Sequence, residues 1–430
     1  MDKNLFDLFY ASAGICTDTR AINDNCLFIC IRGENFDGNK FASKALEEGA
    51  QHVVLDNYEY FVDNGKMTLV DNTVEYLQKL ANFHRKKFDI PVIGITGSNG
   101  KTTTKELMNA VLSKKYKVLA TEGNLNNHLG VPFTLLRLTD EHDIAIIEMG
   151  ANRFKDIEEL SEVAEPTHGI ITNIGKAHLE GFENFAGVLK TKKELYEAVE
   201  KNNGKIIVNM DDPVLIDVLP KGVASTSYGT SDAADIRGEL IALTPFVQMK
   251  WSSGDYSSQD LSTHMVGKYN FYNYLAAAAF GVDFNVPPLL ISEAIQEYEP
   301  TNNRSQVKET ANNTLILDCY NANPTSMASA LESFAMNEYS SKIVILGDMK
   351  ELGAESELEH RKIIQQLEYL GILGYTIGEE FGKIESDSIL NSFSNTNEFI
   401  EYLKGTPISD RMILLKASRS IGLEVLENSL

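Results

Sequence analysis

VIGITGSNGKTT, residues 92–103, is the stretch that decides the fold. Its first five residues form an apolar, largely β-branched run that predicts a buried strand, and a helix is predicted over residues 101–113. The glycine-rich loop between them aims backbone N–H groups and a helix N-terminus at one point, a geometry that binds phosphate. Lys101 would neutralise phosphate charge, and the Thr102 hydroxyl could bind Mg²⁺.

This loop departs from the strict pattern G-x-x-x-x-G-K-[ST], because Ile95 stands at the first glycine position and Gly94 precedes it. A chance glycine-rich turn is the alternative, which the strand and helix on either side disfavour. The predicted phosphate contacts are Gly97, Ser98, Asn99, Gly100, Lys101, Thr102 and Thr103.

The charge of the chain limits its partners. It carries 61 acidic and 39 basic residues, a net charge of −22. Binding to a nucleic-acid backbone needs a basic face, so a nucleic-acid partner is not expected. The four cysteines form no C-x-x-C pair, and no apolar run approaches the roughly 18 residues of a membrane helix. We therefore expect a reduced, cytoplasmic protein with no membrane insertion.

Strands and helices alternate along most of the 430 residues, which predicts an α/β fold with mainly parallel sheets. We expect three domains: a small α/β domain over residues 1–85, a central domain over 86–302 and a doubly wound, Rossmann-like domain over 303–430. The polar segment 301–305 is the expected hinge between the last two, and a helix is expected at 419–428.

Three residues outside the loop are candidates on weaker grounds. Glu148 ends the apolar strand 144–147, where a carboxylate could bind Mg²⁺, although a solvated strand end is equally compatible with the sequence. A lone histidine such as His178 is more often an ordinary core or surface residue. Lys192 lies beside Lys193 in a predicted helix, which by itself indicates a solvated helix face.

Taken together, these features resemble the Mur ligase family, and the resemblance runs nearly end to end. The loop at 96–103 is the family's form of the phosphate-binding loop, including the missing first glycine. Further matching segments are TDTR at 17–20, GENFDG at 33–38, GNLNN at 123–127, HLEGF at 178–182, DCYNANP at 318–324, GDMKELG at 347–353 and KASRS at 416–420. The chain departs from the family at Leu317 and Cys319, where Asp and Ser are frequent.

The resemblance implies an ATP- and Mg²⁺-dependent enzyme that acts on small molecules. Within the family, the best match is the member that joins D-Ala-D-Ala to UDP-MurNAc-tripeptide through an acyl phosphate, as part of peptidoglycan synthesis. The first domain would then bind the UDP-sugar, the central domain ATP, and the last domain the dipeptide. A monomer is expected. The third residue of the tripeptide, usually meso-diaminopimelate or lysine, is not specified by the sequence.

The resemblance also assigns roles to single residues by motif position. Catalytic roles fall to Lys101, His178, Lys192 and Arg304. The implied metal ligands are Thr102, Glu148, His178 and Lys192, the last as a carbamate. The implied nucleotide contacts beyond the loop are Asn270, Arg304 and Asp318. The implied substrate contacts are Thr17, Asp18, Thr19, Arg20, Asn126, Asn127, Tyr320, Asn321 and Asn323.

Two other functions stay open at this point. One is a related ligase that adds a different amino acid or resembles folylpolyglutamate synthase, which the segments at 17–20 and 33–38 disfavour. The other is a nucleotide-binding regulator that hydrolyses ATP slowly without ligation. Detection of the amide product would separate the second from a ligase.

Overall fold

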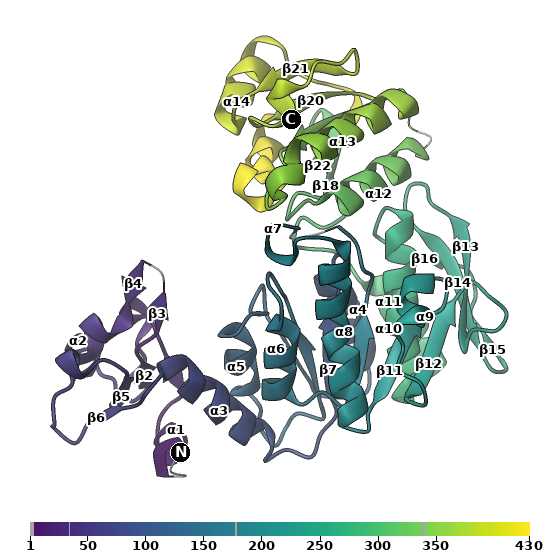
Figure 1. Ribbon diagram of the computed structural model, residues 1–430. Helices are drawn as coiled ribbons and strands as arrows, with labels where there is room; N and C mark the ends of the chain where they lie inside the picture. Colours follow the sequence, from purple (N-terminus) through teal and green to yellow (C-terminus); the bar gives the residue numbers. More distant parts are fainter. Residues whose placement is uncertain (1–3, 34, 177–178, 338, 340) are drawn as a thin grey trace.

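The computed structural model describes residues 4–33, 35–176, 179–337, 339 and 341–430. Within these residues the chain forms three successive α/β units, as Figure 1 shows. The fold class is the predicted one, with parallel-rich sheets covered by helices. None of the helices in the described ranges combines the length and apolarity needed to cross a bilayer.

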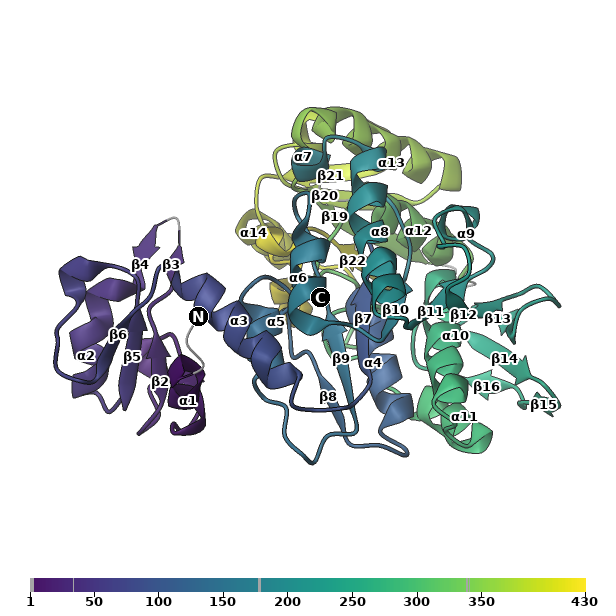
Figure 2. The same cartoon turned by 60° about the horizontal axis from the view of Figure 1, so that its bottom comes forward.

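The N-terminal unit has a small parallel sheet in the order β1-β2-β5-β6. Its elements are α1 (Asn4–Tyr10), β1 (Ile15–Cys16), β2 (Leu27–Ile29), β3 (Arg32–Gly33), β4 (Phe36–Asp37), α2 (Ala42–Glu47), β5 (His52–Leu55), β6 (Met67–Leu69) and α3 (Thr73–Arg85). Asn72 caps α3 through its side chain, and the buried face of this helix packs against α5 and α6 of the next unit. In Figures 1 and 2 the N-terminal sheet stands well apart from the C-terminal unit.

The central unit is built on a sheet in the order β15-β14-β13-β12-β11-β10-β7-β9-β8, with β16 paired to β14. Its strands are β7 (Val92–Thr96), β8 (Val118–Ala120), β9 (Ile144–Glu148), β10 (His168–Ile171), β11 (Lys205–Asn209), β12 (Ala224–Gly229), β13 (Ile236–Ala242), β14 (Gln248–Ser253), β15 (Tyr256–Ser257) and β16 (Leu261–Ser262). The pairs from β8 to β13 are parallel, and the pairs beyond β13 are antiparallel.

Helices cover both faces of the parallel part of this sheet. They are α4 (Lys101–Leu112), α5 (Gly130–Leu135), α6 (Asp156–Ala164), α7 (Leu179–Phe182), α8 (Phe185–Lys201), α9 (Pro213–Asp217), α10 (Lys268–Asp283) and α11 (Pro288–Glu297). Alternate strand residues enter opposite cores: Ile93 packs with α4, α10 and α11, whereas Val92 packs with α5, α6 and α8. A strand buried on both faces explains why its sequence is a continuous apolar run.

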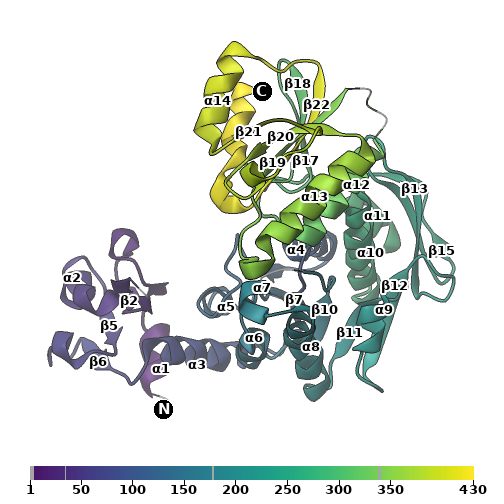
Figure 3. The same cartoon turned by 45° about the horizontal axis from the view of Figure 1, so that its top comes forward.

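The C-terminal unit is a doubly wound sheet in the order β17-β18-β22-β19-β20-β21, parallel except at β17. Its elements are β17 (Gln306–Glu309), β18 (Asn313–Leu317), α12 (Pro324–Ala335), β19 (Lys342–Gly347), α13 (Ser356–Leu370), β20 (Leu373–Ile377), β21 (Ile389–Phe393), α14 (Thr396–Gly405) and β22 (Arg411–Lys416). Figure 3 shows this unit above the central sheet, with α12 and α13 turned toward it.

The helix expected at 419–428 is wrong. The chain there forms two 3-10 segments, Arg419–Ile421 and Leu423–Ser429. Gly422 between them adopts φ +70°, in the left-handed region, which interrupts any α-helix at that residue. Leu423 and Leu426 are nevertheless buried against the sheet, so this segment packs its apolar residues from a tighter turn.

Candidate active site

The carboxyl ends of the parallel central strands meet at one edge of the sheet, where ligands of open α/β sheets bind. The loop after β7, Glu148 at the end of β9 and Asn173 after β10 all line one cavity there. The cavity has a volume of about 1440 Å³ and its other wall comes from the C-terminal unit. A site of this size, shared between two units, can hold more than one substrate at a time.

The glycines of the predicted loop are required by its shape. Gly97 has φ +146°, and a Cβ there would stand 2.0 Å from the Thr172 hydroxyl oxygen. Gly100 has φ +79°, and a Cβ there would stand 2.9 Å from Asn273 Oδ1. The Asn99 backbone N–H donates to Asn173 Oδ1 at 3.0 Å, which ties the loop to the end of β10. The loop is therefore a fixed cradle at the N-terminus of α4, suited to phosphate.

Lys101 is folded back onto this cradle. Its Nζ donates to the Gly97 carbonyl at 2.6 Å. Burial lowers the pKa of Lys101, the nearby Glu148 carboxylate works in the opposite direction, and Arg304 lowers the pKa further. A bound anion would satisfy this ammonium group better than a neutral carbonyl does.

Glu148 is a buried carboxylate in the cavity wall, held by hydrogen bonds from two other segments. It is only 1% exposed, and its Oε1 accepts hydrogen bonds from the Thr102 hydroxyl at 3.1 Å and from Asn126 Nδ2 at 2.8 Å. Its Oε2 is buried and has no hydrogen-bond partner among the described residues. A buried carboxylate oxygen without a partner is costly, and together with the Thr102 hydroxyl it forms a set of hard oxygen donors that fits Mg²⁺.

The rest of the expected metal site is described only in part. His178 lies outside the described residues. Within the described part of the chain, no three side chains of His, Cys, Asp and Glu are grouped closely enough to hold a metal. A cation beside Glu148 would therefore depend on other oxygens for its remaining ligands.

Lys192 does not lie on a solvated helix face. Its side chain is 2% exposed, and its Nζ lies 6.0 Å from the centre of the Phe182 ring. Burial and, secondarily, the positive charge of Lys101 hold the pKa of Lys192 well below its usual value. Its neighbour Lys193 is partly exposed and pairs with Glu197 at 2.8 Å, as a surface lysine does. Lys192 does not line the cavity itself.

The opposite wall of the cavity carries an arginine and an aspartate from the C-terminal unit. The Arg304 guanidinium lies 3.7 Å from the centre of the Tyr320 ring, and its Nε is buried without a partner among the described residues. Asp318 forms an ion pair with Lys416 at 2.5 Å and accepts the backbone N–H of Ser305 at 3.2 Å. A cation in the cavity wall that has an unpaired donor is suited to an anionic ligand.

The predicted asparagines line the same cavity but already have structural partners. Asn323 caps α12 and also donates to Asn99 Oδ1 at 2.7 Å, a direct bond between the two walls. Asn127 Oδ1 accepts the N–H of Gly130 at 2.9 Å, and Asn321 Oδ1 accepts that of Ala322 at 3.0 Å. Asn270 accepts from Asn273 at 2.8 Å.

Residues 17–20 are not part of this cavity. They belong to the N-terminal unit, where Asp18 and Arg20 form an exposed ion pair of 2.7 Å. The pKa of Asp18 falls to about 2, chiefly because Arg20 donates hydrogen bonds to its carboxylate. A ligand that contacts both residues 17–20 and the cavity must therefore be long enough to extend from one unit to the next.

Several cavity residues escaped the sequence predictions. They are Arg153, Asp156, Asp211, Asp212, Lys350, Glu351 and Arg419. All of them follow the carboxyl end of a strand within a few residues or begin the next helix. That position was the available signal, although charged residues after strands are too common to single these out.

The chain matches known protein families over most of its length. The Mur ligase family catalytic domain matches residues 12–85, the Mur ligase middle domain residues 95–281, and the glutamate ligase domain of Mur ligases residues 303–419. Curated relatives include the UDP-N-acetylmuramoyl-tripeptide–D-alanyl-D-alanine ligases of Bacillus subtilis and Escherichia coli, each 32% identical. The first alignment covers 96% of this chain and 91% of the relative, and the second 95% and 92%.

Solved structures agree with these matches. MurF from Acinetobacter baumannii superimposes with a TM-score of 0.89 at 27% identity, covering 100% of this chain and 98% of that one. MurF from Thermotoga maritima, solved in complex with ADP, gives 0.87 at 25% identity, covering 98% and 97%. Sequence similarity across all three units and a shared three-unit architecture lead to one conclusion: the chain belongs to the Mur ligase family.

Proposed function

We propose that this protein is the ATP-dependent ligase that joins D-Ala-D-Ala to UDP-MurNAc-tripeptide, giving the UDP-MurNAc-pentapeptide of peptidoglycan synthesis. The observation that carries the proposal is the composition of the cavity. A phosphate-binding cradle on the central unit faces Arg304 on the C-terminal unit across one shared space. The relatives with end-to-end similarity are named for this reaction, and the ADP in the Thermotoga maritima structure supports ATP as the nucleotide.

The chemistry explains why two such walls are needed. A carboxylate is too poor an electrophile for an amine, so the γ-phosphoryl group is first transferred to it, giving an acyl phosphate and ADP. The dipeptide amine then attacks the acyl carbon, loses a proton, and phosphate leaves. Lys101 neutralises charge on the transferring group and Arg304 binds the phosphate from the opposite wall. The protein contributes positioning and charge rather than covalent catalysis.

Mg²⁺ is part of the proposal. Glu148 and Thr102 would hold it, with His178 and a modified Lys192 as further ligands, and it would supply charge neutralisation between phosphate oxygens. Burial lowers the pKa of Lys192 and so favours the neutral amine that carbamate formation requires, in which the nitrogen adds to CO₂ and loses a proton. The product is an oxygen ligand instead of a cation.

The predicted domains divide the work in this proposal. Residues 1–85 bind the UDP-sugar, residues 86–302 bind ATP, and residues 303–430 bind the dipeptide, with Asn270 and Asp318 contacting the nucleoside. The tripeptide would span from the N-terminal unit to the cavity. We also infer a cytoplasmic monomer, and the four buried free cysteines are compatible with a reducing compartment.

An omission series tests this function. The purified protein is incubated with ATP, Mg²⁺, UDP-MurNAc-tripeptide and D-Ala-D-Ala, and then without each substrate in turn. We expect the pentapeptide by mass spectrometry only in the complete mixture, and no product when single amino acids replace the dipeptide. ATP hydrolysis without any amide product would instead support the regulator.

The role of the N-terminal unit has its own test. Arg20→Ala should weaken binding of UDP-MurNAc-tripeptide by about tenfold or more, because charge-assisted contacts to phosphate are among the stronger polar interactions. ATP binding should not change. Calorimetric titration of both ligands measures this, with Arg137→Ala as the control because that arginine is exposed and paired with Glu122. If Arg20→Ala binds UDP-MurNAc-tripeptide as tightly as the wild type does, residues 17–20 are not part of the UDP-sugar site.

A further inference from the structure

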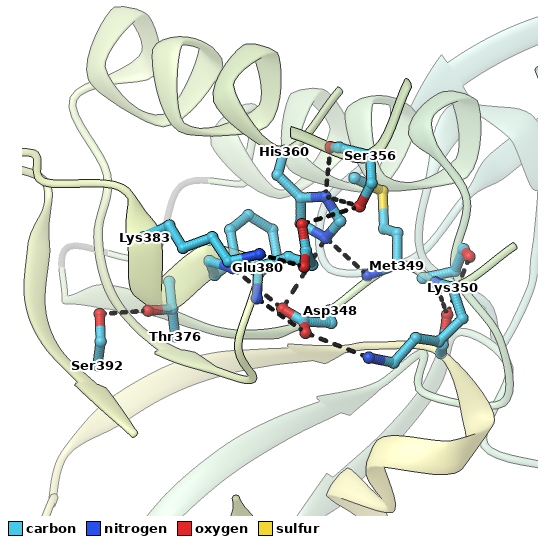
Figure 4. Close-up of polar contacts among 12 residues, drawn as sticks. Asp348, Met349, Lys350, Ser356, His360, Thr376, Glu380, Lys383 and Ser392 are labelled. Carbon is cyan, nitrogen blue, oxygen red and sulfur yellow. Dashed lines mark hydrogen bonds and ion pairs between the residues drawn. The ribbon is translucent and has the colours of Figure 1, made fainter. Parts of the chain in front are cut away.

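The segment 348–353 of the C-terminal unit is held in place by a buried cluster that the reaction scheme above does not use. Three successive backbone N–H groups in it donate to three different parts of the C-terminal unit. Asp348 donates to the Ile377 carbonyl at 3.0 Å, Met349 to His360 Nε2 at 3.0 Å, and Lys350 to the Ser418 hydroxyl at 2.9 Å. Figure 4 shows the bond from Met349 to His360, with Asp348 and Lys350 on either side of Met349.

His360 is fixed as a neutral ring with one tautomer. It is completely buried, and its Nδ1 lies 2.7 Å from the Ser356 carbonyl, which can only accept, so this nitrogen carries the proton. Nε2 is therefore free to accept from Met349. The ring packs edge-on against Phe381 with the centroids 4.6 Å apart.

Asp348 closes the cluster from the other side. It is completely buried, and its two carboxylate oxygens accept the backbone N–H groups of Glu380 and Phe381, both at 3.1 Å. Lys350 Nζ lies 3.3 Å from the same carboxylate. The cluster thus joins the ends of β19 and β20 to α13 (Figure 4).

The segment that is held in this way is strained. Glu351 has φ +64° although it is not a glycine, and Gly353 has φ +53°. A side chain in the left-handed region persists only where surrounding contacts fix it, and such residues concentrate at functional sites. Lys350 and Glu351 both line the cavity.

The same segment and α13 contact the central unit at two residues that flank the undescribed positions 177–178. The Glu180 backbone N–H donates to the Glu351 carbonyl at 3.4 Å, and Lys176 pairs with Glu359 at 2.9 Å. Glu359 and His360 are adjacent on α13. Glu359 contacts the central unit, and His360 accepts the hydrogen bond that fixes the strained segment.

We propose that His360 and Asp348 are positioning residues for ligation, an inference that rests on the proposed function. They hold residues 349–353 in the strained shape that docks against Lys176 and Glu180 of the central unit. That docking sets the geometry of the cavity wall relative to the phosphate cradle. Loss of the pair slows the ligation step while leaving nucleotide and UDP-sugar binding intact, because neither residue belongs to the cradle or to the N-terminal unit.

Two variants of one residue test this. His360→Leu fills the space of the ring without an acceptor, whereas His360→Gln can place an amide oxygen where Nε2 accepts. His84→Leu is the matched control, since His84 is also buried and bonded through both ring nitrogens but lies on α3. We expect His360→Leu to lower kcat about tenfold or more with KM for ATP changed less than about threefold, the pattern of lost positioning.

His360→Gln should recover most of the lost kcat, and His84→Leu should keep kcat within about twofold even if its Tm falls equally. Backbone amides of residues 349–351 should exchange hydrogen faster in His360→Leu than in the wild type. Wild-type kcat in folded His360→Leu, no recovery in His360→Gln, or an equal loss in His84→Leu would each overturn the inference. A wild-type protein that makes no amide would instead overturn the proposed function.

Discussion

Replacement of Glu148 by glutamine gives a sharp test of the metal site. The side chain keeps its shape, so the amide oxygen can still accept from Thr102 and Asn126. The change affects Oε2, which is buried without a partner and becomes an amide nitrogen that cannot bind a cation. The substitution therefore removes one charge and one metal ligand with little disturbance of the surrounding packing.

The expected magnitude follows from the burial of that oxygen. Substitution of a residue that only orients a metal ligand typically lowers metal affinity or activity about 10–100-fold. Substitution of a direct ligand should lower it by at least the upper figure. A hundredfold loss corresponds to about 2.7 kcal/mol. At a fixed Mg²⁺ concentration near saturation for the wild type, the ligation rate of Glu148→Gln should fall about 100-fold, and much higher Mg²⁺ should restore part of it.

The assay is the initial rate of amide formation across a Mg²⁺ titration at saturating ATP. Glu122→Gln serves as the control, because Glu122 is an exposed glutamate of the same unit, paired with Arg137 on the surface. Thermal unfolding without Mg²⁺ should be similar in all three proteins. Unchanged rate and Mg²⁺ dependence in Glu148→Gln would refute a cation at this carboxylate.

Three further predictions concern other residues. Lys101→Ala should lower the ligation rate about 10²–10³-fold, the usual cost of one charge contact in a preorganised site, and near-normal turnover would contradict the phosphate assignment. Lys192→Ala should lose most activity and partly regain it with added short carboxylates, whereas Lys190→Ala and Lys193→Ala should keep theirs; full activity in Lys192→Ala would exclude a carbamate. Burial holds the folded pKa of His84 below 6.5, so the unfolded chain binds this proton more readily, and stability is lost as pH falls from 6.5 toward the folded pKa. Urea midpoints measured across that window should fall less steeply in His84→Gln than in the wild type, and parallel curves would show that the pKa of His84 is the same in the folded and unfolded states.

Much of the fold follows from buried strands in the sequence. The strand predicted at 92–96 has its observed bounds, since it is a short apolar run between Pro91 and a glycine-rich loop. The helix predicted at 419–428 is absent because Gly422 adopts a left-handed conformation, and the residues on either side form 3-10 turns that pack on the sheet.

The candidate site could be predicted only where chemistry is local. The phosphate loop is contiguous, so its geometry follows from eight residues of sequence. The pairing of Glu148 with Thr102 and Asn126 joins three separate segments, and no sequence pattern specifies it. Lys192 shows the limit most clearly: its neighbours in sequence indicate a charged surface, yet its position on α8 turns its side chain into the protein.

The most direct test of the central claim, ligation through an acyl phosphate, is an isotope transfer. UDP-MurNAc-tripeptide labelled with ¹⁸O in its carboxyl groups is converted with ATP, Mg²⁺ and D-Ala-D-Ala, and the released phosphate is analysed by mass spectrometry. If the carboxylate oxygen attacks the γ-phosphorus and leaves with it, one phosphate is released for each amide made. Each of these phosphates carries one ¹⁸O atom. Unlabelled phosphate, or phosphate formed without amide, would contradict the mechanism.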